Sequence, residues 1–173
     1  ESDGTFPNHH PDPTVPENLE DCIGTVQASG AEIGVAFDGD ADRIGVVDRD
    51  GRIIWGDHIL ILYARDVLAR TGAGQPIIFD VKCSQALMDG IEKAGGVPVM
   101  WNTGHSLIKD KMKELHAPIA GEMSGHMFFT ESFYGHDDAL YAAARLLRII
   151  ANSGMRLDEL LADVPPFVST PEL

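Results

Sequence analysis

Three aspartates at alternate positions form the sequence feature best suited to chemistry. Asp38, Asp40 and Asp42 come directly after the apolar run at 33–37. Carboxylate oxygens are the ligands that Mg²⁺ and Ca²⁺ prefer, so carboxylates on one short loop can converge on a hard cation. Arg43 follows them, and a guanidinium beside a cation can bind a phosphoryl group through two parallel hydrogen bonds. The loop therefore predicts a metal site equipped for phosphoryl transfer.

Other aspartate-rich loops have to be compared with this one. An EF-hand calcium loop needs Gly at its sixth position and Glu at its twelfth, but those positions hold Arg43 and Arg49. A phosphatase with an aspartate nucleophile needs a small or hydroxyl-bearing residue where Asp42 stands. A solvated acidic turn is the simplest interpretation in a chain with 27 carboxylates. The EF-hand interpretation fails, whereas the phosphatase stays open as an alternative.

Three more polar clusters follow expected strands. Lys82 comes directly after the apolar run at 77–81, and Asn102–Ser106 follows the run at 97–101. Gly121–His126 follows a shorter strand, and its acid, hydroxyl and imidazole groups suit the hydroxyls of a sugar. A solvated lysine and a plain glycine turn are the alternative interpretations. Because the carboxyl ends of parallel strands meet where ligands bind, all four clusters are expected along one edge of one sheet.

Apolar periodicity predicts the elements that position these clusters. Prolines make residues 1–16 a loop, and from residue 57 onward helical and strand patterns alternate. Two successive strand–helix–strand passages predict an α/β fold with a mainly parallel sheet and three α/β/α layers. The expected strands are 33–37, 44–47, 52–55, 76–81, 97–101 and 118–120, and the expected helices are 17–29, 57–70, 84–94 with Ser84 as its cap, 106–115 and 137–151.

The charge balance limits the partners of the chain. Its 173 residues contain 13 Lys and Arg against 27 Asp and Glu, a formal net charge of −14. A surface that follows nucleic-acid phosphates needs clustered Lys and Arg, so we expect no nucleic acid as partner. The longest apolar stretch, at 59–64, is far too short to span a bilayer, so we expect no membrane association. A phosphorylated metabolite still fits, because a cation can bridge it to an acidic site.

The cysteines and the first residue bear on the setting of the chain. Cys22 and Cys83 lie far apart, in no metal or redox spacing, so we expect reduced thiols in a cytoplasmic protein. No basic region followed by an apolar run opens the chain, so no signal peptide is visible. The sequence begins at Glu1 without a methionine, and it is therefore expected to be part of a longer polypeptide.

Five motifs in a fixed order give the chain its resemblance to a known family. Asp38–Arg43 resembles the metal loop of the α-D-phosphohexomutases, and Gly121–His126 resembles their sugar-specificity loop. The stretches 4–13, 81–83 and 101–106 also resemble bacterial phosphomannomutase/phosphoglucomutase sequences. The resemblance covers nearly the whole chain. It implies a reversible, Mg²⁺-dependent interconversion of hexose 1-phosphate and hexose 6-phosphate, through a phosphoserine enzyme and a bisphosphorylated sugar.

The resemblance also implies a role for each residue of these motifs. Met123 stands where phosphoglucosamine mutases usually carry Gln, so a mannose or glucose phosphate is favoured as substrate. Lys82 and His126 are the candidates for proton transfer at the attacking or leaving hydroxyl. The implied metal ligands are Asp38, Asp40 and Asp42, the implied catalytic residues are Arg43, Lys82, His105 and His126, and the implied substrate contacts are Thr103, Gly104, Glu122, Ser124 and His126.

Members of this family have four domains, and the resemblance divides the chain among them. Residues 1–56 resemble the C-terminal part of the second domain with the metal loop, 57–165 the third domain, and 166–173 a linker towards the fourth. The phosphoserine and the phosphate clamp belong to the first and fourth domains, so the chain alone is expected to be inactive and to need the missing domains of the same polypeptide. The alternatives are an Asp-nucleophile phosphatase, a phosphoglucosamine mutase of the same family, and a non-catalytic sugar-phosphate-binding module.

Overall fold

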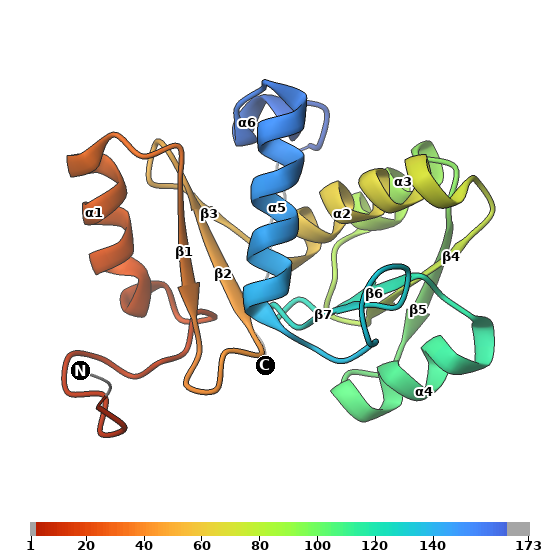
Figure 1. Cartoon of the computed structure of the whole chain (residues 1–173), viewed down its shortest axis with the longest axis horizontal. Coiled ribbons are helices and arrows are strands. Elements are labelled where there is room, and N and C mark those ends of the chain that lie inside the picture. Colours follow the sequence, from red (N-terminus) through yellow and green to blue (C-terminus); the bar gives the residue numbers. More distant parts are fainter. Residues whose placement is uncertain (1–2, 166–173) are drawn as a thin grey trace.

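Two β-sheets lie side by side in the structure, with helix α5 (Ala139–Ser153) between them in the view of Figure 1. The structure is a computed structural model, and it describes residues 3–165 of the 173-residue chain. The first sheet has three strands and the second has four. The predicted linker at 166–173 lies outside the described residues.

The first sheet is antiparallel because short loops join its strands. Its strands are β1 (Ile33–Phe37), β2 (Ile44–Asp48) and β3 (Ile53–Ile54), and each pairs antiparallel with the next. The loop at 38–43 is far shorter than the dozen or more residues that a crossover between parallel strands needs. The strands expected at 44–47 and 52–55 form a hairpin, and β1 joins the same sheet.

Helix α1 (Glu20–Ser29) packs against the first sheet and was expected as part of a helix at 17–29. A 3₁₀ turn, η1 (Pro16–Leu19), precedes it, so the α-helical part begins later than predicted. The helix ends as expected at Gly30, whose φ of 68° lies in the left-handed region that glycine adopts without a steric penalty. The sequence pattern thus predicted the helix and its C-terminal end correctly, whereas the segment that begins at Pro16 forms a 3₁₀ turn instead of the first turn of the α-helix.

The second sheet has the strand order β5-β4-β6-β7. β4 (Pro76–Asp80) pairs in parallel with β5 (Val97–Trp101) on one side and with β6 (Ile119–Gly121) on the other. β7 (Met127–Phe129) returns antiparallel to β6. The predicted mainly parallel sheet is confirmed, and β7 is a strand that the sequence pattern missed.

Four helices cover the two faces of the second sheet (Figure 1). They are α2 (Gly56–Thr71), α3 (Gln85–Lys93), α4 (His105–Leu115) and α5. Ile77 and Phe79 of β4 pack in one apolar cluster with α2, α3 and α5, whereas Ile78 packs in another with α4. Side chains alternate between the two faces along a strand, so this division confirms the three-layer α/β/α fold. A short helix, α6 (Leu157–Leu160), follows α5, and no helix among the described residues is long and apolar enough to cross a bilayer.

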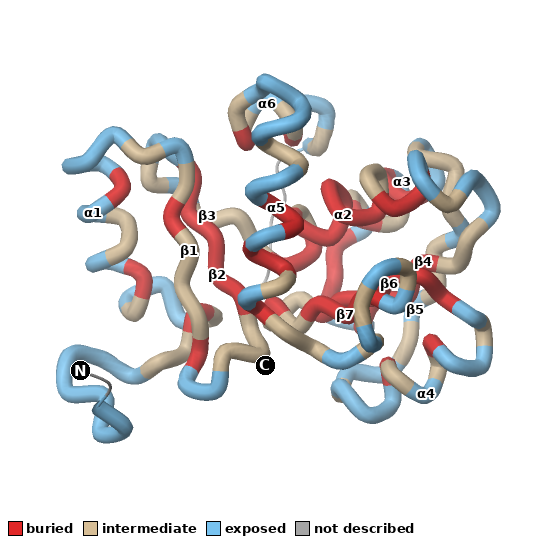
Figure 2. The backbone as a smooth tube through the Cα atoms, in the orientation of Figure 1, coloured by how far each residue is buried: buried red, intermediate tan, exposed pale blue. Residues whose placement is uncertain are grey.

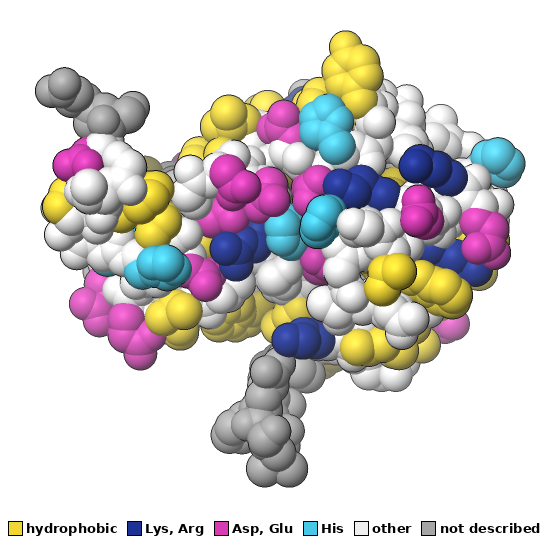
Figure 3. All heavy atoms as spheres, turned by 90° about the horizontal axis from the view of Figure 1, so that it is seen from below, with side chains coloured by type: hydrophobic (Ala, Val, Ile, Leu, Met, Phe, Trp, Pro, Cys, Tyr) yellow, Lys and Arg dark blue, Asp and Glu magenta, His cyan; other side chains and the backbone are white. Residues whose placement is uncertain are grey.

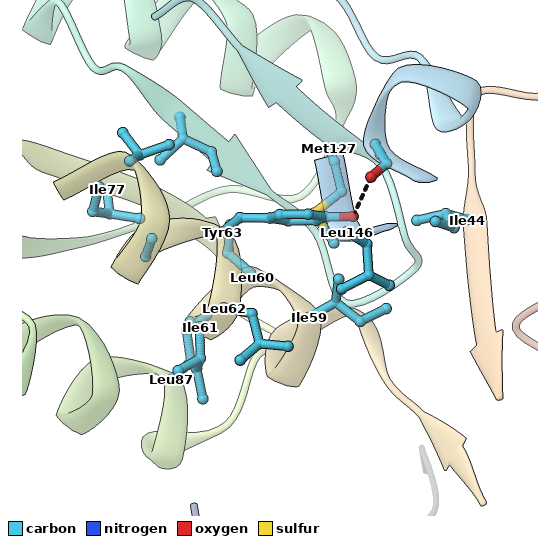
Figure 4. Packing of buried hydrophobic residues seen from close by; sticks show 14 of the residues in the cluster. Ile44, Ile59, Leu60, Ile61, Leu62, Tyr63, Ile77, Leu87, Met127 and Leu146 are labelled. Carbon is cyan, nitrogen blue, oxygen red and sulfur yellow. Dashed lines mark hydrogen bonds between the residues drawn. The ribbon is translucent and has the colours of Figure 1, made fainter. Parts of the chain in front are cut away.

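The core centres on α2, which is buried along most of its length (Figure 2). Tyr63 lies among the labelled core side chains of Figure 4 and is 0% exposed. Its hydroxyl donates a 2.7 Å hydrogen bond to the carbonyl of Ala142 in α5, and its ring meets Phe129 of β7 edge-on. An unpartnered buried hydroxyl would cost about 1–3 kcal/mol, so this hydrogen bond lets the tyrosine join α5 and β7 to α2.

The starts of two helices differ in how their first amides are satisfied. Asp138 caps α5 by accepting a 2.8 Å hydrogen bond from the Tyr141 N–H. Ser84 occupies the cap position of α3 as predicted, but its buried hydroxyl has no hydrogen-bond partner in the described part of the chain. The predicted side-chain cap is therefore wrong. The buried carboxylate of Asp57 lies there and accepts the Ser84 N–H at 3.2 Å.

A buried arginine joins α2, α5 and the segment after β7. Arg145 is 3% exposed and donates to Asp66 at 2.8 Å and to Glu131 at 3.1 Å. Arg148 and Arg70 reach the same Asp66 oxygen at 2.9 and 3.0 Å. Burial acts to raise the pKa of Asp66, but the hydrogen bond from Arg145 and the charges of the three guanidinium groups outweigh it and hold that pKa below 3.8.

Replacing Asp66 with asparagine is expected to destabilise the chain by about 2–3 kcal/mol at neutral pH, because buried Arg145 loses one of its two carboxylate partners. The pKa of Asp66 is lower in the folded than in the unfolded chain. Its stabilisation is therefore present above the ordinary value of 3.8 and is lost as the pH falls through the lower folded value. Urea unfolding at neutral and at strongly acidic pH measures the effect. Asp110→Asn on exposed α4 is the control, and an undiminished Asp66→Asn effect in acid would contradict the prediction.

Candidate active site

The acidic loop between β1 and β2 holds three carboxylates close together. Asp38, Asp40 and Asp42 each offer an oxygen, and these oxygens lie within 4.8 Å of one another. Asp38 is buried at the end of β1, Asp42 is half-buried and Asp40 is exposed. Ala41 takes a φ of 59° at the tip, a left-handed conformation that costs a non-glycine residue about 1–2 kcal/mol. The loop therefore accepts local strain in order to bring the carboxylates together.

Asp38 holds this loop in place from inside. One of its oxygens accepts the backbone N–H groups of Asp42 and Arg43, both at 3.0 Å, and the other accepts the Arg43 side chain at 2.7 Å. Burial acts to raise the pKa of Asp38, but these hydrogen bonds and the guanidinium charge outweigh it and lower the pKa. Asp38 is thus an ionised carboxylate whose two oxygens are oriented by the loop.

The pKa of Asp42 indicates that the three carboxylates repel one another when no cation lies between them. Burial first, and then the neighbouring Asp38 and Asp40 carboxylates, raise the pKa of Asp42 to about 6. Like charges held this close repel each other, and a divalent cation between them would remove the repulsion. An all-oxygen set of this kind fits a hard cation such as Mg²⁺ better than a softer metal.

Arg43 connects the acidic loop to a large cavity. Its guanidinium also forms a 3.2 Å ion pair with Asp12 of the N-terminal segment. The cavity has a volume of about 1020 Å³, and the predicted site residues Arg43, Lys82 and Ser124 line it together with Met123. Figure 3, which views the molecule from below, shows acidic, histidine and Lys or Arg side chains gathered across the middle of one face. Charged groups of both signs therefore gather on this face of the molecule.

His126 lies where the acidic loop meets the second sheet. It forms an isolated antiparallel β-bridge with Arg43, and its Nδ1 lies 3.6 Å from an Asp42 oxygen. The same nitrogen lies 3.1 Å from an oxygen of Asp137, which is close enough for an ion pair. It has no well-aligned hydrogen-bond partner among residues 3–165. His126, Asp42 and Asp137 could also hold a metal ion, but the Lys109 ammonium lies 3.1 Å from Asp137 and opposes a second cation. The predicted site residue His105 is close by, with its ring centre 6.4 Å from that of His126.

The predicted sugar loop joins β6 to β7 and is tied to the segment after β5. Glu122 is 3% exposed, and its Oε1 accepts the Gly104 N–H at 2.6 Å. Thr103 in turn donates to Asp80 at the end of β4, at 2.9 Å. The loops that carry the predicted substrate contacts are therefore linked to each other by buried carboxylates.

The four polar clusters do meet, but they do not share one sheet. The segments with Lys82, Thr103 and Glu122 follow β4, β5 and β6 of the parallel sheet, at the carboxyl ends of these strands. The expectation is wrong for the acidic loop, which belongs to the antiparallel sheet. It reaches the others because the Ile44 N–H donates to the Gly125 carbonyl at 3.1 Å. A backbone hydrogen bond between the two sheets thus brings the acidic loop to the other clusters, where a shared sheet edge was expected to do so.

Several residues of the site were missed because their partners are far away in sequence. Asp12, Asp80 and Asp137 contact predicted site residues, and Lys109 binds Asp137. Of these four only Asp12 lies in a recognised motif, the stretch at 4–13, and no role was assigned to it there. Asp80 carried a signal of its own, because it is a carboxylate at the end of an otherwise apolar strand.

The chain matches two parts of one protein family. The family profile described as "Phosphoglucomutase/phosphomannomutase, alpha/beta/alpha domain III" matches residues 55–167, and the profile for domain II of the same family matches residues 1–51. The phosphomannomutase/phosphoglucomutase of Pseudomonas putida is 55% identical over 173 residues, which are 100% of this chain and 37% of that protein. The phosphoglucomutase of Neisseria gonorrhoeae is 54% identical with the same coverage of both chains.

A solved structure agrees with these sequence matches. The crystal structure of a phosphoglucomutase/phosphomannomutase family protein from Burkholderia thailandensis is similar to this chain, with a TM-score of 0.93 and 54% identity. The similarity covers 99% of this chain and 37% of that chain. The chain thus spans a little over a third of the length of each of these relatives.

Proposed function

The chain belongs to the phosphoglucomutase/phosphomannomutase family, and from this membership we propose that it carries the magnesium loop and the sugar-binding loop of a hexose-phosphate mutase. The reaction is a reversible interconversion of hexose 1-phosphate and hexose 6-phosphate, through a phosphoserine enzyme and a bisphosphorylated sugar. One observation carries the proposal. The acidic loop and the loop at 121–126 meet backbone to backbone, through the Arg43–His126 bridge and the hydrogen bond from Ile44 to Gly125.

Three carboxylates support the magnesium part of the proposal. Asp38, Asp40 and Asp42 would hold Mg²⁺ through one oxygen each, as their spacing within 4.8 Å allows. Mg²⁺ bound there supplies neutralisation of charge on the transferring phosphoryl group. Arg43 lies beside these carboxylates and lines the cavity, and we assign it to the phosphoryl oxygens, which a guanidinium can bind with two hydrogen bonds.

The other site residues are assigned to the sugar and to its protons. Ser124 lines the cavity and would bind a sugar hydroxyl, with Glu122 as an acceptor in the same loop. Lys82 lines the cavity as well, and with His126 it is our candidate for holding a proton at the attacking or leaving oxygen. The remaining proposed contacts to the hexose phosphate are Thr103, Gly104 and His105.

We take the substrate to be a mannose or glucose phosphate. The relatives from Pseudomonas putida and Neisseria gonorrhoeae carry the names of mutases for these sugars. Met123 lines the cavity at the position where phosphoglucosamine mutases usually have Gln, which supports the same choice. A preference for glucosamine phosphate is the alternative within the family.

The proposed mutase is longer than this chain. We assign residues 1–56 to the end of its second domain, 57–165 to its third and 166–173 to a linker, with the phosphoserine and the phosphate clamp supplied by other domains of the same polypeptide. The described cysteines, Cys22 and Cys83, are both free thiols, which supports a cytoplasmic setting.

An exchange protein tests the proposal directly. In it, these 173 residues replace the matching segment of the Pseudomonas putida relative, which supplies the missing domains. We expect interconversion of mannose 1-phosphate and 6-phosphate, and of the glucose phosphates, with kcat/KM within about tenfold of the unaltered relative, because the site geometry belongs to this segment. The 173-residue chain alone should give no turnover.

Other outcomes would contradict the proposal. Release of inorganic phosphate by the chain alone, abolished by Asp38→Asn, would indicate the phosphatase instead. A well-folded exchange protein that binds hexose phosphate without turning it over would indicate a non-catalytic binding module. A strong preference for glucosamine phosphate would correct the substrate while keeping the reaction.

A further inference from the structure

Asp80 is a buried carboxylate to which the proposed mechanism gives no role. It is the last residue of β4, the strand that lies between β5 and β6, and it is 1% exposed. We propose that Asp80 is a positioning residue that fixes three loops of the active site relative to one another. The inference rests on the proposed function, because these loops carry the residues assigned to the hexose phosphate.

The contacts of Asp80 reach three separate loops. Its Oδ1 accepts the Met123 N–H at 3.0 Å and the Cys83 thiol at 3.1 Å, and its Oδ2 accepts the Thr103 hydroxyl at 2.9 Å. These donors stand 43, 3 and 23 residues away in the sequence. They belong to the loops that follow β6, β4 and β5. One carboxylate therefore holds the ends of three parallel strands together.

Burial makes these hydrogen bonds matter. A carboxylate removed from water is strongly unfavourable unless donors surround it, and bonds to an ionised acceptor are stronger than neutral ones. Burial first, and then the charge of Asp80, raise the pKa of the Cys83 thiol. The thiol therefore keeps its proton and can act as a donor to Asp80.

Each donor is next to a residue assigned to the active site, and Thr103 is itself one of the assigned residues. Cys83 follows Lys82, Thr103 precedes Gly104 and His105, and Met123 lies between Glu122 and Ser124. Glu122 adds a second tie by accepting the Gly104 N–H at 2.6 Å. A shift of one loop against another by about 1 Å can cost about 100-fold in rate, so this buried junction sets the geometry of the site.

Asp48 provides a matched control, because it is an equally buried carboxylate whose hydrogen-bond partners among residues 3–165 lie in its own turn. It lines the cavity as well, but it is not among the residues assigned to the hexose phosphate. It is 2% exposed and accepts the N–H groups of Asp50 and Arg52, both at 2.9 Å, in the turn between β2 and β3. Its loss should loosen that turn alone. The loss of Asp80 should instead loosen three loops together.

Hydrogen–deuterium exchange of the 173-residue chain tests the junction without any assay of activity. In Asp80→Asn we expect amide exchange at Gly104 and Met123 to rise by about tenfold or more, while Asp48→Asn leaves both amides unchanged. Thr103→Val removes only the hydroxyl donor and is close to isosteric. It should still raise exchange at Met123, to which Thr103 makes no hydrogen bond among residues 3–165, and Thr103→Ser should keep the slow rate.

Kinetics of the exchange protein then test the role in the site. Asp80→Asn should lower kcat by about tenfold or more, whereas Asp48→Asn, which is expected to lose stability as well, should stay within about twofold. Unchanged exchange at Met123 in Thr103→Val, or equal kcat values for the two aspartate variants, would overturn the inference. If Asp80→Asn fails to fold, Thr103→Val decides. If the unsubstituted exchange protein has no mutase activity, the proposed function fails while the exchange experiment still decides on Asp80.

Discussion

Replacing Asp40 with asparagine is expected to lower kcat of the exchange protein by about 1,000-fold, with little change in stability. A bound Mg²⁺ contributes several kcal/mol to phosphoryl transfer, and the loss of about 4 kcal/mol corresponds to three orders of magnitude. Asp40 is exposed, and among residues 3–165 no hydrogen bond or ion pair holds its side chain. The substitution therefore removes a proposed metal ligand without disturbing the fold, unlike a substitution of Asp38.

Two measurements separate the metal from the fold in this experiment. Isothermal titration with Mg²⁺ should show weaker binding by Asp40→Asn, while urea unfolding should match the unsubstituted protein. Asp89→Asn is the control, because Asp89 is an exposed carboxylate of α3 whose side chain, among residues 3–165, accepts a hydrogen bond from Gln85 of its own helix and from no other residue. Full mutase activity in Asp40→Asn would rule out the acidic loop as the metal site.

The sequence predicted the larger elements because their signals are local. The helices at 57–70 and 137–151 have apolar stripes at helical spacing, and both are present within two residues at each end. The strand at 76–81 is apolar except for Asp80, as expected for a strand covered on both faces. The family resemblance read from five motifs is confirmed as well, because motif residues are adjacent in sequence.

The elements that were missed have signals shorter than a helical turn or depend on tertiary contacts. β7 has three residues, and its pairing with β6 gives it a strand conformation that three apolar residues alone do not indicate. The acidic loop was assigned to the parallel sheet because a strand precedes it. Its length, which forbids a crossover, was the stronger argument and placed it in a hairpin.

The residues of the site could be predicted from motifs, but their hydrogen-bond partners could not. The Arg43 guanidinium binds Asp12, which lies 31 positions earlier in the sequence. No periodicity in the sequence connects the two residues. Glu122 is a proposed contact to the sugar, and its Oε1 also accepts the Gly104 N–H across two loops, which no motif indicates. Such long-range hydrogen bonds are set by how the strands are ordered in the sheet, and a single sequence does not contain that order.

Gly125→Ala is expected to cause the largest loss of stability among single substitutions in the candidate site, about 3 kcal/mol or more. A Cβ at Gly125 would lie 2.4 Å from the Ile44 carbonyl oxygen, so backbone would have to move. The residue also has a φ of 101°, which strains any side chain. The same movement would break the hydrogen bond from Ile44 to Gly125 that joins the two sheets. Mutase activity of the exchange protein should therefore fall together with its unfolding midpoint.

Substitutions at two other glycines separate the effect of a positive φ from the effect of the backbone clash. Gly154→Ala carries the strain of a positive φ, 65°, but its Cβ would meet nothing within 4 Å, so we expect a loss of about 1 kcal/mol. Gly24→Ala lies within α1 with open space around it, and a small gain of about 0.5–1 kcal/mol is expected there. If Gly125→Ala proved no less stable than Gly154→Ala in urea, the contact between Gly125 and Ile44 would not be what holds the acidic loop against the sugar-binding loop.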